Sequence, residues 1–154
     1  MNAMKLDRNA STDADAIWVV GDRIRFLGGL PTTDVELIEV DVPPGSGTPP
    51  HSHASAEMFY ILSGELTVRD FSEAGRPPSV TVAKPGDAIT LASRKAHNYS
   101  NEGDMPVKML VLIEPSMIAF FREVGTSEPQ AEPDFARLGA VMERHGIDLL
   151  GAAA

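Results

Sequence analysis

Residues 45–64 read GSGTPPHSHASAEMFYILSG, and they hold two of the four histidines of this 154-residue chain. His51 and His53 are separated by one residue, and side chains two apart in a β-strand point to the same face. Both imidazoles are therefore expected to face one interior. Glu57 is too far along the chain to share their site on the same straight strand. The sequence thus predicts a turn before Glu57, which then opens a second strand back beside the first.

A second segment, residues 86–101, reads GDAITLASRKAHNYSN and contains His97. Three imidazoles and one carboxylate form a complete set of protein ligands for a divalent transition metal ion. The chain has no cysteine, so nitrogen and oxygen alone would hold a metal. We predict that His51, His53, Glu57 and His97 meet around one ion inside a β-barrel. The ion would be Fe, Mn, Ni, Co, Cu or Zn, because affinity order alone does not choose among them.

The chain around these segments is predicted to form short strands. Residues 17–115 contain runs of alternating apolar and polar residues separated by Gly and Pro, with no helical pattern between them. Gly21-Asp22 is interpreted as a turn, and Gly64 as a hairpin turn between two of the strands. Such a series of strands is typical of a sandwich or a barrel, and hence of an all-β domain.

The spacing Gly45-x5-His51-x-His53-x3-Glu57-x6-Gly64 resembles the first sequence motif of the cupin family at every defined position.

The second cupin motif is matched in part. Gly86, His97 and Asn101 stand at their positions, but Ala92 replaces the proline of the motif and Arg94 replaces its second glycine. Glycine permits a tight turn there. We therefore expect the loop before His97 to take a different shape, without consequence for the metal site.

The resemblance covers roughly residues 35–115. It implies a cupin barrel (a double-stranded β-helix, or jelly roll) with a short C-terminal helical tail, and it implies a homodimer. The small single-domain architecture is similar to the quercetin dioxygenase-like group. That similarity implies a metal-dependent dioxygenase acting on a small aromatic or enolic compound, with Glu57 taking a proton from a substrate hydroxyl. A non-oxidative isomerase or epimerase and a non-catalytic binding protein are the alternatives, because cupins serve many functions.

Composition limits the partners. The net charge is −9 and there is no basic run, which argues against a nucleic-acid partner or an anionic membrane. No stretch reaches the roughly 18 apolar residues of a membrane span. The N-terminus lacks the apolar run of a signal peptide, so a cytoplasmic location is expected.

The two ends of the chain differ from its middle. Residues 1–16 are polar and are predicted to be a flexible segment. Residues 116–154 are predicted to form a helical tail that packs on the barrel. Its first helix would have Ser116 as N-cap, and its second would carry an apolar stripe of Phe135, Leu138, Met142 and His145.

Strand alternation also predicts a substrate pocket beside the metal. The candidate lining residues are Phe59, Ile61, Tyr99, Met109 and Val111. A ring-lined cavity with one metal suits a small, flat, hydroxylated molecule. Met58, Tyr60 and Leu62 would then lie on the opposite face of their strand, where they are candidates for a dimer contact.

Overall fold

The computed structural model describes residue 8 and residues 15–151, so most of the predicted flexible segment lies outside the described residues. The elements follow one another along the chain as eleven strands and two helices within this described part. In chain order they are β1 (Ile17–Val19), β2 (Asp22–Gly29), β3 (Glu36–Val42), β4 (His51–Ser52), β5 (Glu57–Ser63), β6 (Leu66–Asp70), β7 (Ser79–Ala83), β8 (Ala88–Leu91), β9 (His97–Ser100), β10 (Val107–Ile113), α1 (Pro115–Val124), α2 (Phe135–Arg144) and β11 (Asp148–Leu149).

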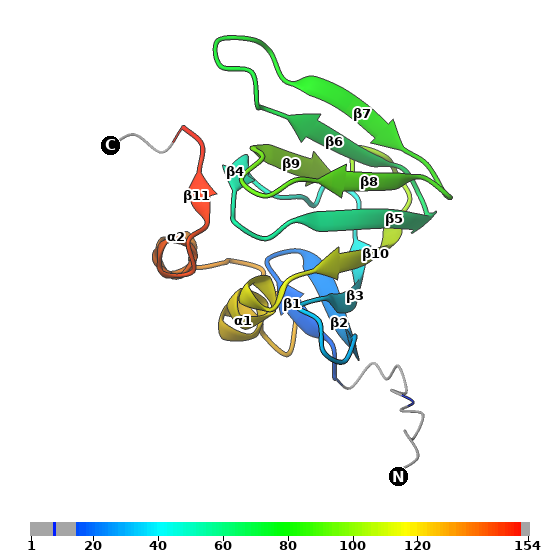
Figure 1. Ribbon diagram of the computed structural model, residues 1–154, viewed down its shortest axis with the longest axis vertical. Coiled ribbons are helices and arrows are strands. Elements are labelled where there is room, and N and C mark those ends of the chain that lie inside the picture. The colour runs from blue at the N-terminus through cyan, green and yellow to red at the C-terminus, as the bar shows by residue number, and fades with distance from the viewer. Residues whose placement is uncertain (1–7, 9–14, 152–154) are drawn as a thin grey trace.

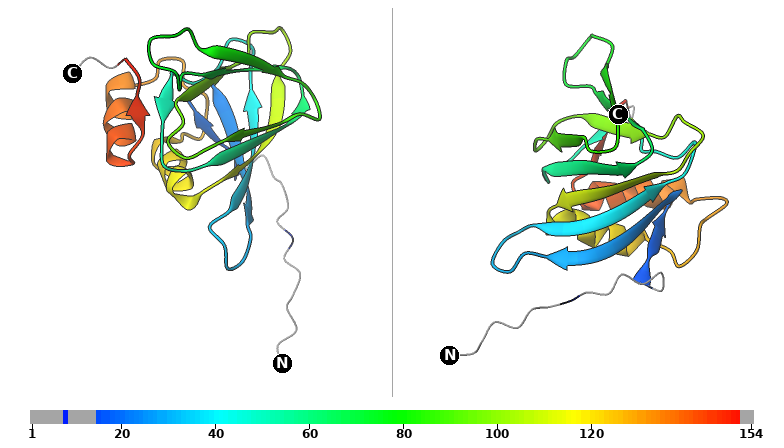
Figure 2. Two further views of the ribbon diagram at one scale, coloured as in Figure 1. Left: turned by 45° about the horizontal axis from the view of Figure 1, so that its top comes forward. Right: turned by 90° about the vertical axis from the view of Figure 1, so that its right-hand side faces the viewer.

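The strands form two sheets that curl around a common interior (Figures 1 and 2). The six-stranded sheet has the order β1-β2-β3-β10-β5-β8, and the five-stranded sheet has the order β11-β4-β9-β6-β7. The two helices follow the last barrel strand, and both lie on the same side of the molecule (Figure 2). The predicted fold class, an all-β barrel with a C-terminal helical tail, is confirmed.

Strand alternation builds the core. On β3, Ile38, Val40 and Val42 are each no more than 3% exposed. Their antiparallel partner β10 faces Val40 with Met109 and Ile38 with Val111, and both are equally buried. Each such side chain contributes roughly 1.5–3 kcal/mol by leaving water. The same period of two that fills the core also points the functional side chains inward.

Gly64 connects the two sheets and does not form the predicted hairpin. β5 pairs with β10 and β8, whereas β6 pairs with β9 and β7 in the other sheet. Gly64 has a φ of 78°, and a Cβ added there would lie 2.6 Å from the carbonyl oxygen of Pro106. Glycine is therefore required both for the backbone conformation and for the close approach.

The position predicted for β5 beside the histidine strand is also wrong. β4 pairs with β9 and β11, so β5 lies across the barrel from it, in the other sheet. Alternation within a strand says which face is buried, but it carries no information about which sheet the strand joins.

The first helix begins two residues earlier than predicted. Glu114, not Ser116, is the N-cap of α1, and its side chain makes no capping hydrogen bond within the described structure. Pro115 takes the first helical position, where its fixed φ is already helical and its missing N–H costs nothing. Neither helix of the described residues is long and apolar enough to cross a membrane.

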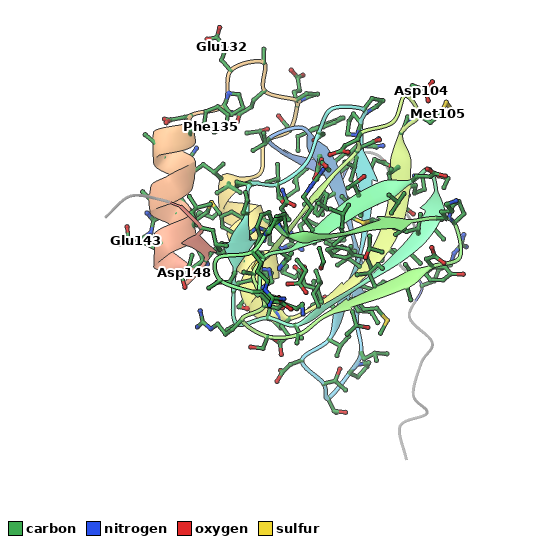
Figure 3. All side chains as sticks on the ribbon, turned by 90° about the horizontal axis from the view of Figure 1, so that it is seen from above. Asp104, Met105, Glu132, Phe135, Glu143 and Asp148 are labelled. Atoms are coloured by element: carbon green, nitrogen blue, oxygen red, sulfur yellow. The ribbon has the colours of Figure 1, made fainter. Side chains whose placement is uncertain are left out.

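The second helix buries part of the predicted stripe: Met142 is buried and Leu138 packs against the core, but Phe135 does not. Phe135 is 68% exposed and lies at the outer start of α2 (Figure 3). Val141 and Met142 are the buried residues of this helix. Phe135 sits in the first turn, beyond the reach of the barrel.

The tail ends in a strand that the sequence did not predict. β11 pairs with β4, placing Leu149 opposite His51 and Asp148 opposite Ser52. The backbone N–H of Leu150 also donates to the carbonyl oxygen of Pro50 at 3.0 Å. The tail is therefore part of the five-stranded sheet, at the strand that carries a predicted metal ligand.

Candidate metal centre and its cavity

The predicted ligands converge from both sheets. His51 on β4 lies directly opposite His97 on β9, and His53 follows β4 by one residue. Glu57 is the first residue of β5 in the opposite sheet. All four are buried, with exposures of 7% or less. The curled sheets thus bring one carboxylate to three imidazoles inside the barrel.

The three imidazoles form one compact cluster. The ring of His51 lies 4.5 Å from that of His97 and 5.3 Å from that of His53, measured between centroids. One ring nitrogen of each histidine lies within 4.8 Å of the other two. Nitrogens bound to one ion at about 2.1 Å are at most about 4 Å apart. The cluster is therefore close to the spacing that a shared ion needs.

Backbone carbonyls fix the tautomers of the three rings. Nδ1 of His51 donates to Pro49 O at 2.7 Å, Nδ1 of His53 to Ser55 O at 2.8 Å, and Nδ1 of His97 to Lys95 O at 2.7 Å. A carbonyl oxygen can only accept, so each Nδ1 carries the hydrogen. In a neutral ring, Nε2 then keeps a free lone pair. Metal-binding histidines are oriented in this manner.

The Nε2 atom of His53 provides the test of whether the residues fit a metal. It is fully buried and has no hydrogen-bond partner among the described residues. A buried polar atom left without a partner costs about 1–3 kcal/mol. A metal ion bound by the cluster would satisfy it, and the nitrogen donor set is one that divalent transition metals accept. The site therefore fits a metal ion.

Glu57 borders the cluster and touches two of its members. Its Oε1 lies 3.4 Å from Nε2 of His53, and its Oε2 lies 3.6 Å from Nε2 of His97. Burial by itself would raise the pKa of Glu57, but the two adjacent imidazoles outweigh burial and lower that pKa to about 2. Glu57 is therefore ionised at neutral pH, as a metal-binding carboxylate must be.

The pKa values of His51 and His53 are shifted in opposite directions. Burial lowers the pKa of His51 to about 4, which keeps this imidazole neutral and able to bind a metal. Burial also acts to lower the pKa of His53, but the Glu57 carboxylate beside it prevails and raises it. The Glu57 carboxylate therefore offsets the effect of burial at His53.

A cavity of about 120 Å³ opens beside the cluster, and His51, Glu57 and His97 form part of its wall. The rest of the wall is mainly apolar and comes from both sheets and both helices. Four of the five predicted pocket residues line it: Phe59, Tyr99, Met109 and Val111.

Ile61 does not line the cavity, contrary to the prediction. It is fully buried one step further along β5, towards the Gly64 connection. Its backbone N–H donates to Asp87 O, and its carbonyl accepts from Gly86 N. Ile61 therefore fills the packed end of the barrel, because alternation predicts an inward side chain but not the position of the void.

Sequence reasoning missed Asp22, which lines the same cavity. Asp22 was interpreted as a turn residue, but the turn consists of Val20 and Gly21, and Asp22 opens β2 with only 5% exposure. Ser46 and Tyr99 both donate hydrogen bonds to its carboxylate. The only sequence signal was an acidic residue beside an apolar run, which is also common at exposed turns.

The altered second motif keeps its turn. Arg94 has a φ of 63°, the left-handed conformation that glycine favours, so the loop does not need the different shape expected for it. Its backbone N–H donates to His53 O at 2.8 Å, and its guanidinium lies 3.5 Å from Asp148 of β11. The loop therefore ties together the segments that carry His53 and His97.

Comparison with known proteins gives one family. Residues 38–113 match the profile of the cupin domain family. The germin-like protein subfamily 2 member 1 of Arabidopsis thaliana is 32% identical over 93 residues, which are 60% of this chain and 42% of that protein. Germin-like protein 5-1 of Oryza sativa subsp. japonica matches with the same identity and the same shares. The chain spans less than half the length of these relatives.

Among solved structures, the polyketide cyclase RemF from Streptomyces resistomycificus is similar with a TM-score of 0.59 and 26% identity. The match covers 71% of this chain and 80% of that one. A sugar phosphate isomerase from Silicibacter pomeroyi has a TM-score of 0.51 at 23% identity, covering 61% of this chain and 59% of that one. The latter likeness shows the fold alone.

Proposed function

Because this chain carries a domain of the cupin superfamily, we propose that it is a metal-dependent enzyme acting on a small aromatic or enolic compound. One observation carries the proposal: three imidazoles with fixed tautomers and an ionised carboxylate meet at the wall of a buried, mainly apolar cavity. His51, His53 and His97 would hold the ion, with Glu57 as the fourth ligand. The ion would be Fe, Mn, Ni, Co, Cu or Zn.

The cavity limits the size of the substrate. A dry apolar cavity of about 150 Å³ holds one benzene molecule, and this cavity measures about 120 Å³. The volume is therefore of the order needed for a compound of about one ring. Phe59 and Tyr99, whose ring centroids are 5.7 Å apart in an edge-to-face arrangement, provide an aromatic side for such a ring.

The side chains around the cavity would bind the substrate and accept a proton from its hydroxyl group. A bound metal ion would act as a Lewis acid and template for a substrate oxygen. Glu57, at the histidine end of the cavity, would take the proton of an enolic or phenolic hydroxyl. Much of the surrounding wall is apolar, and a low-dielectric surrounding strengthens each electrostatic contact made there.

For the reaction, oxygen-dependent cleavage by a dioxygenase is our first candidate. It is supported by a mainly apolar cavity for an electron-rich ring beside a cluster of nitrogen and oxygen ligands. The test loads the protein separately with Fe, Mn, Ni, Co and Cu and measures oxygen uptake with catechol, resorcinol and acetylacetone. Absence of uptake across this panel, with metal bound, would contradict the dioxygenase.

A non-oxidative reaction is the second candidate, because RemF is described as a polyketide cyclase and is 26% identical to this chain. Substrate consumption under nitrogen at the rate seen in air would favour this candidate. Consumption that stops without oxygen would favour the dioxygenase.

The ligand assignment is tested by elemental analysis. His97→Ala is expected to lower metal affinity by more than the roughly 10–100-fold that loss of an outer partner costs. His145→Ala is the matched control, since His145 lies outside the cluster and contacts Glu123. Equal metal content in the wild type and His97→Ala would refute the site.

A further inference from the structure

A second polar group lies in the cavity wall, formed by residues from three separate segments. The carboxylate of Asp22 accepts a hydrogen bond from Ser46 Oγ at 2.6 Å on one oxygen and from the Tyr99 hydroxyl on the other. Asp22 begins β2, Ser46 belongs to the loop before β4, and Tyr99 lies on β9. We call Asp22, Ser46 and Tyr99 the carboxylate cluster.

The surrounding backbone is shaped to hold this cluster. A Cβ at Gly21 would lie 2.6 Å from Ser46 Oγ, so glycine leaves the space that the Ser46 hydroxyl occupies. Thr48 fixes β9 at Tyr99, because its backbone N–H donates to Tyr99 O at 2.9 Å and its hydroxyl accepts from Tyr99 N at 3.2 Å. The cluster is therefore a built feature and not a chance contact.

The carboxylate cluster and the histidines occupy different parts of the cavity. Tyr99 and His97 point to the same face of β9, two residues and hence roughly 7 Å apart along the strand. Both line the cavity, as does Phe59 on the opposite sheet. The cavity wall thus carries the histidine cluster, apolar side chains and, from other segments, the Asp22 carboxyl group.

Asp22 has unused capacity to accept hydrogen bonds. A carboxylate offers about four acceptor positions, and the described residues fill two of them. Within the described chain no lysine or arginine forms an ion pair with Asp22, so its carboxyl group is buried without a neighbouring cation. Burial accordingly raises the pKa of Asp22, against the effect of its two hydrogen bonds. A further hydroxyl donor would relieve part of the cost of this burial.

We propose that Asp22 accepts a hydrogen bond from a substrate hydroxyl at the end of the cavity away from the histidines. The preferred ligand is then a single ring with an oxygen function at each end. One oxygen would bind at the histidine cluster, and the other would donate a hydrogen bond to Asp22. Tyr99 and Ser46 act as positioning residues that hold the carboxylate in place. This inference rests on the proposed function, because it describes the substrate of the same cavity.

Calorimetric titration of the zinc-loaded protein with phenol and with hydroquinone tests the proposal. Zinc has no redox chemistry, and nitrogen protects the hydroquinone. We expect the wild type to bind hydroquinone at least about tenfold more tightly than phenol, because the second hydroxyl meets a charged acceptor. Asp22→Asn should reduce this preference to about threefold or less, as for a neutral hydrogen bond. Asp41→Asn, the same change on β3 beside Arg23, should retain the wild-type ratio.

The outcomes separate this inference from the proposed function. No hydroquinone preference in the zinc-loaded wild type, or no binding of either ligand, overturns the role of Asp22, and so does an unchanged preference in Asp22→Asn. If the wild type binds no zinc, the proposed metal-dependent function is refuted. The titration with hydroquinone is then made on the metal-free protein. There Asp22→Asn must still weaken hydroquinone binding at least about threefold, and unchanged binding overturns the inference.

Discussion

His51 is the residue whose surroundings most directly couple the site to pH. Its ring is buried against two other imidazoles, and burial is the main cause that lowers its pKa from 6.5 to about 4. In the unfolded chain His51 takes up a proton near pH 6.5, whereas the folded protein resists protonation until about pH 4. The contribution of neutral His51 to stability is therefore complete above pH 6.5 and declines as the pH falls towards 4.

We predict that His51→Asn makes the metal-free protein less sensitive to acid. The pKa difference between 6.5 and about 4 corresponds to roughly 3 kcal/mol. The wild type should therefore lose about that much free energy of unfolding relative to His51→Asn between pH 7 and pH 4. Urea unfolding in the presence of a chelator at several pH values measures the difference. Parallel pH profiles of the two proteins would contradict a buried neutral His51.

At the scale of elements, the loop between β8 and β9 carries a conformational cost. Arg94 has a φ of 63°, and a left-handed backbone costs a residue with a Cβ roughly 1–2 kcal/mol. The ion pair of Arg94 with Asp148 returns little, because both side chains are more than half exposed.

Two substitutions separate these effects. Arg94→Gly and Arg94→Ala both remove the ion pair, but only glycine relieves the backbone. We expect Arg94→Gly to be about 1 kcal/mol more stable than Arg94→Ala in urea unfolding. Equal stability of the two variants would show that the loop is not strained at this position.

β11 supports the strand that carries His51. Within the described sheet, β11 pairs with β4 on the side opposite β9. Ile147, just before β11, is 3% exposed and lines the cavity. The C-terminal tail therefore contacts the strand that carries His51, a member of the histidine cluster.

We predict that a chain ending at Gly146 loses both stability and metal affinity. Loss of one large buried aliphatic side chain typically costs 2–5 kcal/mol, so removing Ile147 should cost about 3 kcal/mol. Freeing β4 should weaken metal binding about tenfold, by analogy with loss of an outer partner. Thermal unfolding and a competition titration with zinc measure the two effects. A chain ending at Gly151 is the control, and wild-type zinc affinity in the shorter chain would exclude the link.

For the molecule as a whole, residue spacing predicted which side chains point inward. It did not predict which of the two sheets each strand joins. The spacing of His51 and His53 predicted that both face one interior, because residues that share a period of two share a face. The position of His97 in a metal site followed from the resemblance of residues 86–101 to the second cupin motif. Asp22 and the Gly64 connection were misread, because both depend on which strands lie across the barrel. β11 was missed because two residues are too few for a detectable period. The cytoplasmic location stays a prediction.

The outer face of β5 and β10 remains apolar. Met58, Tyr60, Leu62 and Leu112 are 38%, 43%, 41% and 39% exposed, and Leu112 pairs with Met58 in the register of the two strands. We call these four residues the outer face. Neighbouring exposed apolar residues of this kind are typical of contacts between proteins. β8 is the edge strand beside this face, which leaves room for a second copy to approach.

We therefore predict a homodimer in which two copies of the outer face meet about a twofold axis. Light scattering at tens of micromolar should give twice the mass of one chain. Leu62→Glu places a charge in the contact and should give a monomer, with metal content unchanged because its side chain points away from the barrel interior. Leu30→Glu is the matched control, since Leu30 is 61% exposed in the loop after β2. A wild-type monomer, or a dimer that survives Leu62→Glu, would rule out this face as the interface.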